Sequence, residues 1–206
     1  MGLSAPALAA AIEALAAADP RLAAAIDRIG APEPRIRPRG PATLLRAIIG
    51  QQVSVKAAAS IWNRLEAAAG GDANDLARLA ALSPEELRAA GLSGQKASYV
   101  HALAAAVIAG HLDFASLPED DEQAVLALTA IKGIGRWTAE IYLLFAEGRP
   151  DVFPGGDLAV QIEMGRLLGL PARPPEKATR LLAEPFRPHR GALAILCWHS
   201  YNITAL

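Results

Sequence analysis

The most informative residues of the chain are two glycines, Gly133 and Gly135, which enclose one apolar residue between two helix-forming runs. So tight a turn needs residues that tolerate positive φ and close backbone approach. It leaves the first amides of the following helix directed outward, where they could bind a phosphate oxygen. The neighbouring Lys132 and Arg136 add positive charge. The pattern predicts a phosphate-binding hairpin, although an ordinary helical corner with two solvated basic residues would look the same.

An aspartate further along could supply chemistry. Asp157 ends a Pro-Gly-Gly break and precedes another apolar-periodic run, which places its carboxylate at a helix N-terminus. A carboxylate fixed there could stabilise positive charge on a sugar as its base departs, and could orient or deprotonate an attacking water. The simpler interpretation is that Asp157 only caps its helix. Together, the hairpin and the aspartate suggest chemistry on a nucleic acid.

The composition limits the classes of protein to consider. Of the 206 residues 52% are hydrophobic, with many alanines, which favours helices. The net charge of −1 gives no overall basic field, so nucleic-acid binding would need locally clustered positive charge. The single cysteine, Cys197, excludes an internal disulfide and a four-cysteine iron–sulfur cluster. No uninterrupted apolar run is long enough to span a bilayer. We expect a soluble, intracellular, helical protein.

Helical periodicity, interrupted by Gly, Pro and capping residues, recurs along the chain. The predicted helices cover residues 5–18, 20–29, 42–49, 53–69, 74–81, a segment starting at 83, 93–109, a segment from 119 into the hairpin, 135–147, 157–168, 174–184 and 188–204. We predict an all-α fold of two helical lobes flanking a cleft. One lobe is expected from residues 1–45 and 170–206, and the other from residues 46–169, including the helix-hairpin-helix at 128–147 and the helix of Asp157.

Four segments resemble the helix-hairpin-helix superfamily of DNA glycosylases, and within it the branch typified by 3-methyladenine DNA glycosylase II. They are residues 45–54 (LRAIIGQQVS), 91–97 (GLSGQKA), 131–139 (IKGIGRWTA) and 152–157 (VFPGGD). The resemblance implies an enzyme of base excision repair that flips alkylated bases out of double-stranded DNA and hydrolyses their N-glycosidic bond. The leading substrate would be 3-methyladenine, with 7-methylguanine as a further candidate. Larger members carry an N-terminal β domain, so a compact form without one is expected.

The resemblance also assigns roles to residues. Asp157 falls on the required catalytic aspartate. Trp137 stands where strand-cutting relatives carry a Schiff-base lysine, which implies a monofunctional enzyme without lyase activity. An aromatic residue there lines the base pocket in the alkylation branch, and its face would attract a cationic methylated purine. His189 replaces the second pocket aromatic, and Tyr142 could face either the pocket or the core.

The DNA contacts implied by the resemblance lie on three segments. The loop of residues 50–53 would insert Gln52 into the space left by the flipped base. Alternatively, Gln51 and Gln52 would cap or contact the helix that follows them. Backbone carbonyls of the hairpin would ligate Na⁺ or K⁺, with no other cofactor required. The DNA-contacting candidates are Gln51, Gln52, Ser54, Lys96, Lys132, Gly133, Gly135, Arg136 and Thr138, and the cation ligands would be Thr129, Ile131 and Ile134.

Two alternatives remain open at this point. A glycosylase for oxidised or deaminated bases would differ mainly at the position of Trp137 and in the aromatic lining of the pocket. A non-catalytic DNA-damage-binding protein could use the same fold, although the presence of Asp157 argues against it. In either case the expected partner is duplex DNA, bound by a monomer in a prokaryote-like cytoplasm, in association with the nucleoid and without membrane attachment.

Overall fold

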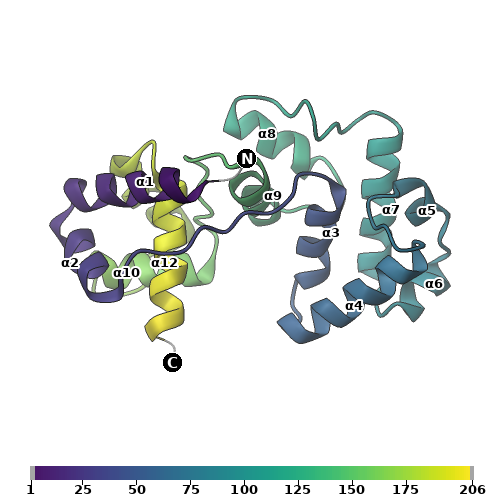
Figure 1. Cartoon of the computed structure of the whole chain (residues 1–206), viewed down its shortest axis with the longest axis horizontal. Coiled ribbons are helices and arrows are strands. Elements are labelled where there is room, and N and C mark those ends of the chain that lie inside the picture. The colour runs from purple at the N-terminus through teal and green to yellow at the C-terminus, as the bar shows by residue number, and fades with distance from the viewer. Residues whose placement is uncertain (1–2, 205–206) are drawn as a thin grey trace. The chain divides into compact units, whose positions relative to one another are not determined.

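A computed structural model describes residues 3–204, and it contains helices and no strand within that range (Figure 1). The elements are α1 (Ala5–Ala18), α2 (Pro20–Ile29), α3 (Pro41–Gly50), α4 (Val55–Ala68), α5 (Leu76–Ala81), α6 (Pro84–Ala89), α7 (Gly94–Ile108), α8 (Asp121–Thr129), α9 (Arg136–Tyr142), the π-helical η1 (Leu143–Glu147), α10 (Leu158–Leu167), α11 (Glu176–Ala183), the 3₁₀-helical η2 (Glu184–Phe186) and α12 (Arg190–Thr204). The expected all-α fold is confirmed. None of the helices in residues 3–204 is both long and apolar enough to cross a bilayer.

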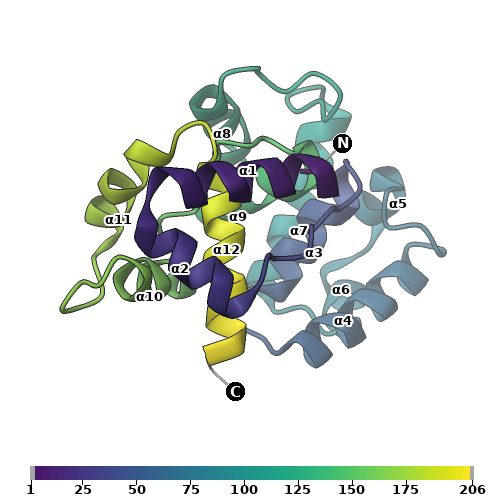
Figure 2. The same ribbon diagram turned by 60° about the vertical axis from the view of Figure 1, so that its left-hand side comes forward.

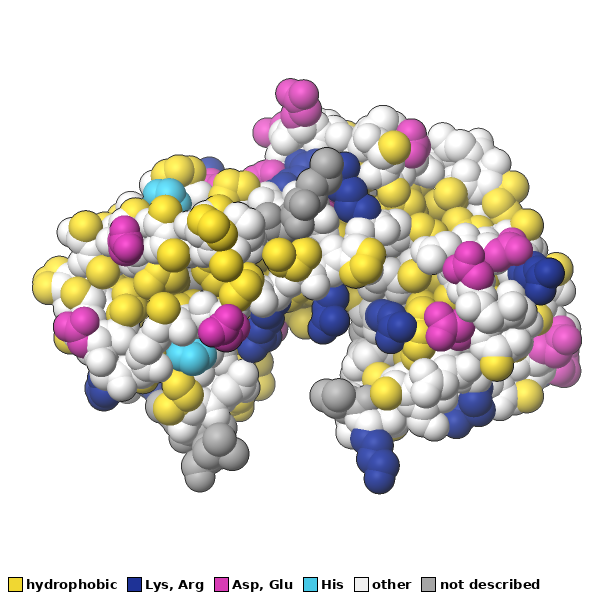
Figure 3. All heavy atoms as spheres, in the orientation of Figure 1, with side chains coloured by type: hydrophobic (Ala, Val, Ile, Leu, Met, Phe, Trp, Pro, Cys, Tyr) yellow, Lys and Arg dark blue, Asp and Glu magenta, His cyan; other side chains and the backbone are white. Residues whose placement is uncertain are grey.

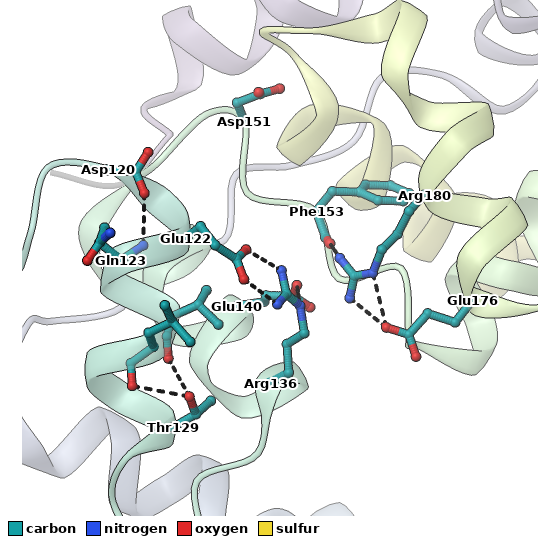
Figure 4. A network of polar contacts seen from close by, with 12 residues as sticks. Asp120, Glu122, Gln123, Thr129, Arg136, Glu140, Asp151, Phe153, Glu176 and Arg180 are labelled. Atoms are coloured by element: carbon teal, nitrogen blue, oxygen red, sulfur yellow. Dashed lines mark hydrogen bonds and ion pairs between the residues drawn. The ribbon is translucent and has the colours of Figure 1, made fainter.

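Local capping signals set where several helices begin. Ser83 accepts a hydrogen bond from the amide of Glu86 (3.2 Å), and the Glu86 carboxylate accepts one from the amide of Ser83 (2.7 Å). This is the reciprocal capping box that the Ser-Pro-Glu-Glu pattern predicts, and Pro84 occupies the first helical position. Asp120 caps α8 through a single hydrogen bond that its carboxylate accepts from the amide of Gln123 (Figure 4). Such caps satisfy amides that the helix itself leaves without acceptors.

The chain divides into two compact units. Unit 1 combines the two ends of the chain, up to Ile36 and from Leu143 onward. Its core surrounds α12, whose residues 192–197 are all buried, and α10 and α1 pack against that helix (Figure 2). The helix that follows Asp157 therefore belongs to unit 1. The sequence analysis placed it with residues 46–169, whereas the structure groups it with α12, against which α10 packs.

Unit 2 is the continuous segment Arg37–Tyr142. Its helix α3 packs against α4, α7 and α9, and its core is built from leucine, isoleucine and valine side chains. The most buried of these are Leu44, Leu45, Ile48, Leu65, Leu79, Leu87, Val100 and Leu103. The helix-hairpin-helix formed by α8 and α9 lies in this unit. Over the face seen in Figure 3, acidic and basic side chains are interspersed, in keeping with the net charge near zero.

Candidate active site

Asp157 has one carboxylate oxygen held by three donors. Its Oδ1 accepts hydrogen bonds from the amides of Ala159 (2.9 Å) and Val160 (3.1 Å), which makes Asp157 the N-cap of α10. The same oxygen accepts a third hydrogen bond from Trp198 Nε1 (3.1 Å). The residue is half-buried. Two backbone donors and one indole donor fix the orientation of the carboxylate, which is the property that a charge-stabilising group needs.

Trp198 is the residue that the sequence analysis missed. It is buried, with its ring centroid 5.5 Å from that of Phe145. The guanidinium carbon of Arg35 lies 5.8 Å from the Trp198 ring centroid, within cation–π range. Trp198 therefore ties α12 to the carboxylate at the start of α10. The two residues are 41 positions apart, so no local pattern could have paired them.

A further polar contact joins α10 to α12, in addition to the hydrogen bond between Trp198 and Asp157. Glu163 is buried and accepts hydrogen bonds from Ser200 Oγ (2.7 Å) and Arg166 Nη1 (2.8 Å). Burial raises the pKa of the Cys197 thiol, and the carboxylates of Glu163 and Asp157 raise it further. Cys197 therefore stays a protonated thiol at neutral pH and is unsuited to be a nucleophile.

The loop that leads into Asp157 is held against α11. Arg180 donates a hydrogen bond from Nη1 to the carbonyl of Phe153 (2.9 Å) and pairs with Glu176 (2.8 Å), as Figure 4 shows. A Cβ added at Gly155 would lie 2.6 Å from Cγ of Arg180. The glycine is therefore needed for close packing against the arginine, and that packing sets the path of the chain into Asp157.

The other aspartate of this region, Asp151, is committed to ion pairs. Its carboxylate contacts Arg187 Nη1 (2.6 Å) and Arg190 Nη2 (2.8 Å), and both arginines also pair with Glu184. A carboxylate bound by two guanidiniums is poorly suited to activate water. Asp157 is the better candidate for chemistry.

The two glycines of the hairpin serve different purposes. Gly133 has φ +93°, and an added Cβ would lie 2.1 Å from a ring carbon of Tyr99 on α7. Gly135 has no heavy atom within 4 Å of an added Cβ, and its carbonyl accepts the first hydrogen bond of α9 from Ala139 (3.0 Å). Gly133 is thus required by the fold. Gly135 leaves open space at the helix start, where a phosphate could approach.

The two basic residues of the hairpin differ in whether acidic side chains neutralise their charge. Arg136 makes a bidentate pair with Glu122 (2.7 and 2.6 Å) and donates to Glu140 (2.9 Å), as Figure 4 shows. These carboxylates raise the pKa of the guanidinium and offset its charge. Lys132 is exposed and has no ion pair within the described part of the chain. A phosphate at the hairpin would have to compete with Glu122 for Arg136, whereas Lys132 is available.

Hydrogen bonds anchor the loop of residues 50–53 on the N-terminal side of Gln52. Lys96 Nζ donates to the carbonyls of Ile49 and Gln51, both at 2.7 Å, and burial lowers the pKa of this amine. Gln51 Nε2 donates to Thr138 Oγ1 (3.2 Å). Gln52 is exposed and has φ +55°, the one positive φ outside glycine in residues 3–204. Left-handed backbone at a non-glycine residue costs of order 1–3 kcal/mol and is concentrated at functional sites.

The residues predicted to line the base pocket differ in how far they are exposed to solvent. Trp137 is 39% exposed at the start of α9, and His189 is half-exposed just before α12. Tyr142 is 1% exposed; its hydroxyl accepts a hydrogen bond from the amide of Gly40 (3.0 Å) and its ring packs on Phe114. Of the two positions left open for Tyr142, the core of unit 2 is the one observed. Thr138 is likewise buried, so its hydroxyl contacts Gln51 rather than an exposed surface.

A family model described as "HhH-GPD superfamily base excision DNA repair protein" matches residues 45–188. The chain belongs to this superfamily. The match includes the loop of Gln52, the hairpin and Asp157, and Trp198 lies beyond its end.

The similar proteins and solved structures below all carry the name of a 3-methyladenine DNA glycosylase or glycosidase. The chain is 34% identical to "DNA-3-methyladenine glycosylase 1" of Schizosaccharomyces pombe over 78% of this chain and 72% of the relative. It is 32% identical to "DNA-3-methyladenine glycosylase 2" of Escherichia coli, over 76% of this chain and 56% of the relative. Among solved structures, the S. pombe 3-methyladenine DNA glycosylase in complex with abasic DNA aligns with a TM-score of 0.82 and 29% identity, covering 95% of this chain and 97% of that one. A DNA-3-methyladenine glycosidase from Bacillus halodurans aligns with a TM-score of 0.84 and 31% identity, covering 100% and 93%.

The hairpin of this superfamily member could accept a cation only through its backbone. No group of three or more His, Cys, Asp or Glu side chains in the described residues is placed to hold a metal. The carbonyl of Ile131 accepts one hydrogen bond, from the amide of Ile134 (3.1 Å). A carbonyl oxygen has two lone pairs, so capacity for a ligand remains there. The predicted set of Thr129, Ile131 and Ile134 carbonyls stays a prediction.

Proposed function

We propose that the chain is a monofunctional DNA glycosylase that hydrolyses the N-glycosidic bond of alkylated bases, 3-methyladenine foremost, in base excision repair. The observation that carries the proposal is the carboxylate of Asp157, fixed by three donors in a superfamily of base excision repair proteins. Relatives that are 28–34% identical are named as DNA-3-methyladenine glycosylases or an alkylbase DNA glycosidase-like protein, which supports the substrate class.

The reaction breaks the bond between C1′ of the sugar and the base nitrogen, and the bonding electrons leave with the base. Positive charge develops on the sugar, and the carboxylate of Asp157 stabilises it. Water then adds to C1′, and its proton passes to the carboxylate or to solvent. A base that methylation has made cationic leaves as a neutral molecule, so a separate general acid is not required.

The residue type at position 137 supports a single activity. Trp137 occupies the position where a lysine would form a Schiff base with the sugar, and an indole has no such amine. The amine of Lys96 is occupied by two backbone carbonyls. The exposed indole of Trp137 offers a π face that binds a cationic base more strongly than a neutral one. The product is an abasic site in an intact strand.

Binding to duplex DNA relies on unit 2. The amides beyond Gly135 and the charge of Lys132 bind a phosphate. The carbonyls of Thr129, Ile131 and Ile134 would hold a Na⁺ or K⁺ ion, which would supply further positive charge at this site. Gln52 fills the space of the flipped base. Hydrogen-bond anchoring through Lys96 and Gln51 holds the backbone of this loop in place. The enzyme works as a monomer on chromosomal DNA in the cytoplasm.

The test is incubation with a duplex oligonucleotide that carries 3-methyladenine, followed by separate assays for free base and for strand breaks. We expect free base and an abasic site that breaks only after alkali. Strand breaks without alkali would contradict the monofunctional assignment. Tight binding without release of base would favour the non-catalytic damage-binding protein instead.

A further inference from the structure

Besides the hairpin with Lys132 and Arg136, unit 2 contains another group of basic residues, to which no function has been assigned so far. A surface cavity of about 310 Å³ lies between α3 and α4 and is lined by Arg37, Arg46 and Trp62. Gly50 and Val53, the two ends of the loop that carries Gln52, complete its wall. The cavity is therefore built into the same loop as the residue proposed to enter the DNA stack.

Arg46 is held in a fixed plane within this cavity. Its guanidinium carbon lies 3.8 Å from the ring centroid of Trp62, which is 3% exposed and so is itself immobilised by packing. A guanidinium over an indole face is held by the ring, and its N–H donors, which lie in the plane of the guanidinium, stay free to bind an acceptor at its edge. Because Arg46 is already restricted before a ligand binds, less side-chain entropy is lost on binding.

Glu66 offsets part of the positive charge of the cavity from a distance, but no ion pair between described residues neutralises it. Neither Arg37 nor Arg46 forms an ion pair within residues 3–204. Burial lowers the pKa of Arg46, Glu66 raises it, and the positive charge of Arg37 lowers it again. Two guanidiniums that disfavour each other and share one cavity are suited to an anion with several acceptor oxygens.

We propose that Arg37 and Arg46, the latter presented by Trp62, bind a backbone phosphodiester of duplex DNA beside the insertion point of Gln52. The inference rests on the proposed function, since the ligand is the same DNA. Phosphate suits the cavity because a planar guanidinium makes bidentate contacts with it. The contact fixes the register of the loop on the duplex and carries no sequence information.

The first experiment measures binding of a duplex with an abasic-site analogue as a function of salt. We expect Arg46→Gln to weaken binding about fivefold to tenfold and to reduce the slope of log affinity against log salt by about 0.9, the value for one phosphate contact. Arg37→Gln, at an exposed position, should change the slope in the same direction. The matched control is Arg88→Gln on α6, which removes the same charge from an arginine paired with Glu85. Unchanged slopes for both cavity variants would overturn the proposal.

A second pair of variants tests the role of the indole. Trp62 Nε1 has no acceptor among the described residues, so Trp62→Phe keeps the aromatic face and loses no hydrogen bond. Trp62→Leu removes the face and keeps an apolar side chain. We expect the Phe variant to bind DNA as the wild type does and the Leu variant to resemble Arg46→Gln. Equal affinities for the Phe and Leu variants would show that stacking does not present the arginine.

The strand that supplies the phosphate is identified by neutral methylphosphonate linkages, introduced singly in the lesion strand or in the opposite strand. At the contacted linkage, Arg46→Gln should cause no further loss of affinity, whereas elsewhere the two losses should add. Additive losses at every linkage of both strands would contradict a specific site. Single-turnover base release at saturating enzyme should not change in the control variant Arg88→Gln, whose arginine lies outside the proposed site. If the wild type binds DNA but releases no base, the proposed function fails while the salt slopes still decide this inference.

Discussion

The indole N–H of Trp198 donates a hydrogen bond to Oδ1 of Asp157 across 3.1 Å, and so joins the last helix of the chain to the carboxylate at the start of α10. The two backbone donors on the same oxygen come from the helix that Asp157 caps. The indole is thus the one donor among the three that is independent of α10. It restricts rotation of the carboxylate about its own side chain.

Replacing Trp198 by Phe should therefore slow base release without unfolding the protein. Phenylalanine keeps an aromatic ring beside Phe145 and removes the N–H donor. A hydrogen bond to a charged group contributes about 1.5–3 kcal/mol, which corresponds to a loss of roughly tenfold to a hundredfold in the single-turnover rate. DNA affinity and circular dichroism should be unchanged. Trp62→Phe removes an indole N–H that has no acceptor and serves as the control. A Trp198→Phe variant with the wild-type rate would show that the contact is only structural.

The two glycines of the hairpin should separate folding from DNA binding. Gly133→Ala forces a Cβ into the ring of Tyr99 at a positive φ, and we expect it to destabilise the protein by more than about 2 kcal/mol. Gly135→Ala meets open space, so its cost should stay within about 1 kcal/mol. Its methyl group should nevertheless obstruct the phosphate and weaken DNA binding. Urea denaturation and DNA titration of both variants check this. Wild-type DNA affinity of Gly135→Ala would argue against a phosphate at the hairpin.

Asp19 gives a prediction about pH and stability in unit 1. Its carboxylate accepts hydrogen bonds from the side chain and the amide of Arg21, and the contact with the guanidinium lowers the pKa of the carboxyl below the ordinary value. A carboxyl with a lowered pKa in the folded state stabilises it above the unfolded-state pKa of about 3.9 and loses that effect as the pH falls through the folded-state value. Asp19→Asn should thus be about 1 kcal/mol less stable at pH 7, and the difference should shrink below pH ~3.9. A constant difference across the acid range would contradict the ion-pair account.

Local signals in the sequence predicted most of the secondary structure. Ser83 with Glu86 marked the start of α6, and Pro154, Gly155 and Gly156 before Asp157 marked the start of α10. These signals work because a cap or a break acts within a few residues of the helix end. The resemblance of short motifs then identified the superfamily, because those motifs lie on the hairpin and on the loop of Gln52.

Contacts between distant segments could not be predicted in the same way. The pairing of Arg136 with Glu122 spans 14 positions and offsets a charge that the sequence analysis had assigned to DNA. Lys96 was expected at a phosphate, and its amine instead joins two carbonyls of a loop 45 and 47 positions away. The unit boundary also depended on packing between α10 and α12, which periodicity does not reveal. Tertiary contacts therefore decide which charged side chains remain available to bind DNA.

The most direct test of the account compares the wild type with Asp157→Asn under single-turnover conditions on a duplex with 3-methyladenine. Asparagine keeps an oxygen that can cap α10 and accept from Trp198, and removes the negative charge. We predict unchanged folding, affinity for an abasic-site duplex within about threefold, and base release slowed by at least about a hundredfold, the usual cost of removing an electrostatic stabiliser. Base release by Asp157→Asn at the wild-type rate would contradict the central claim that this carboxylate drives the reaction.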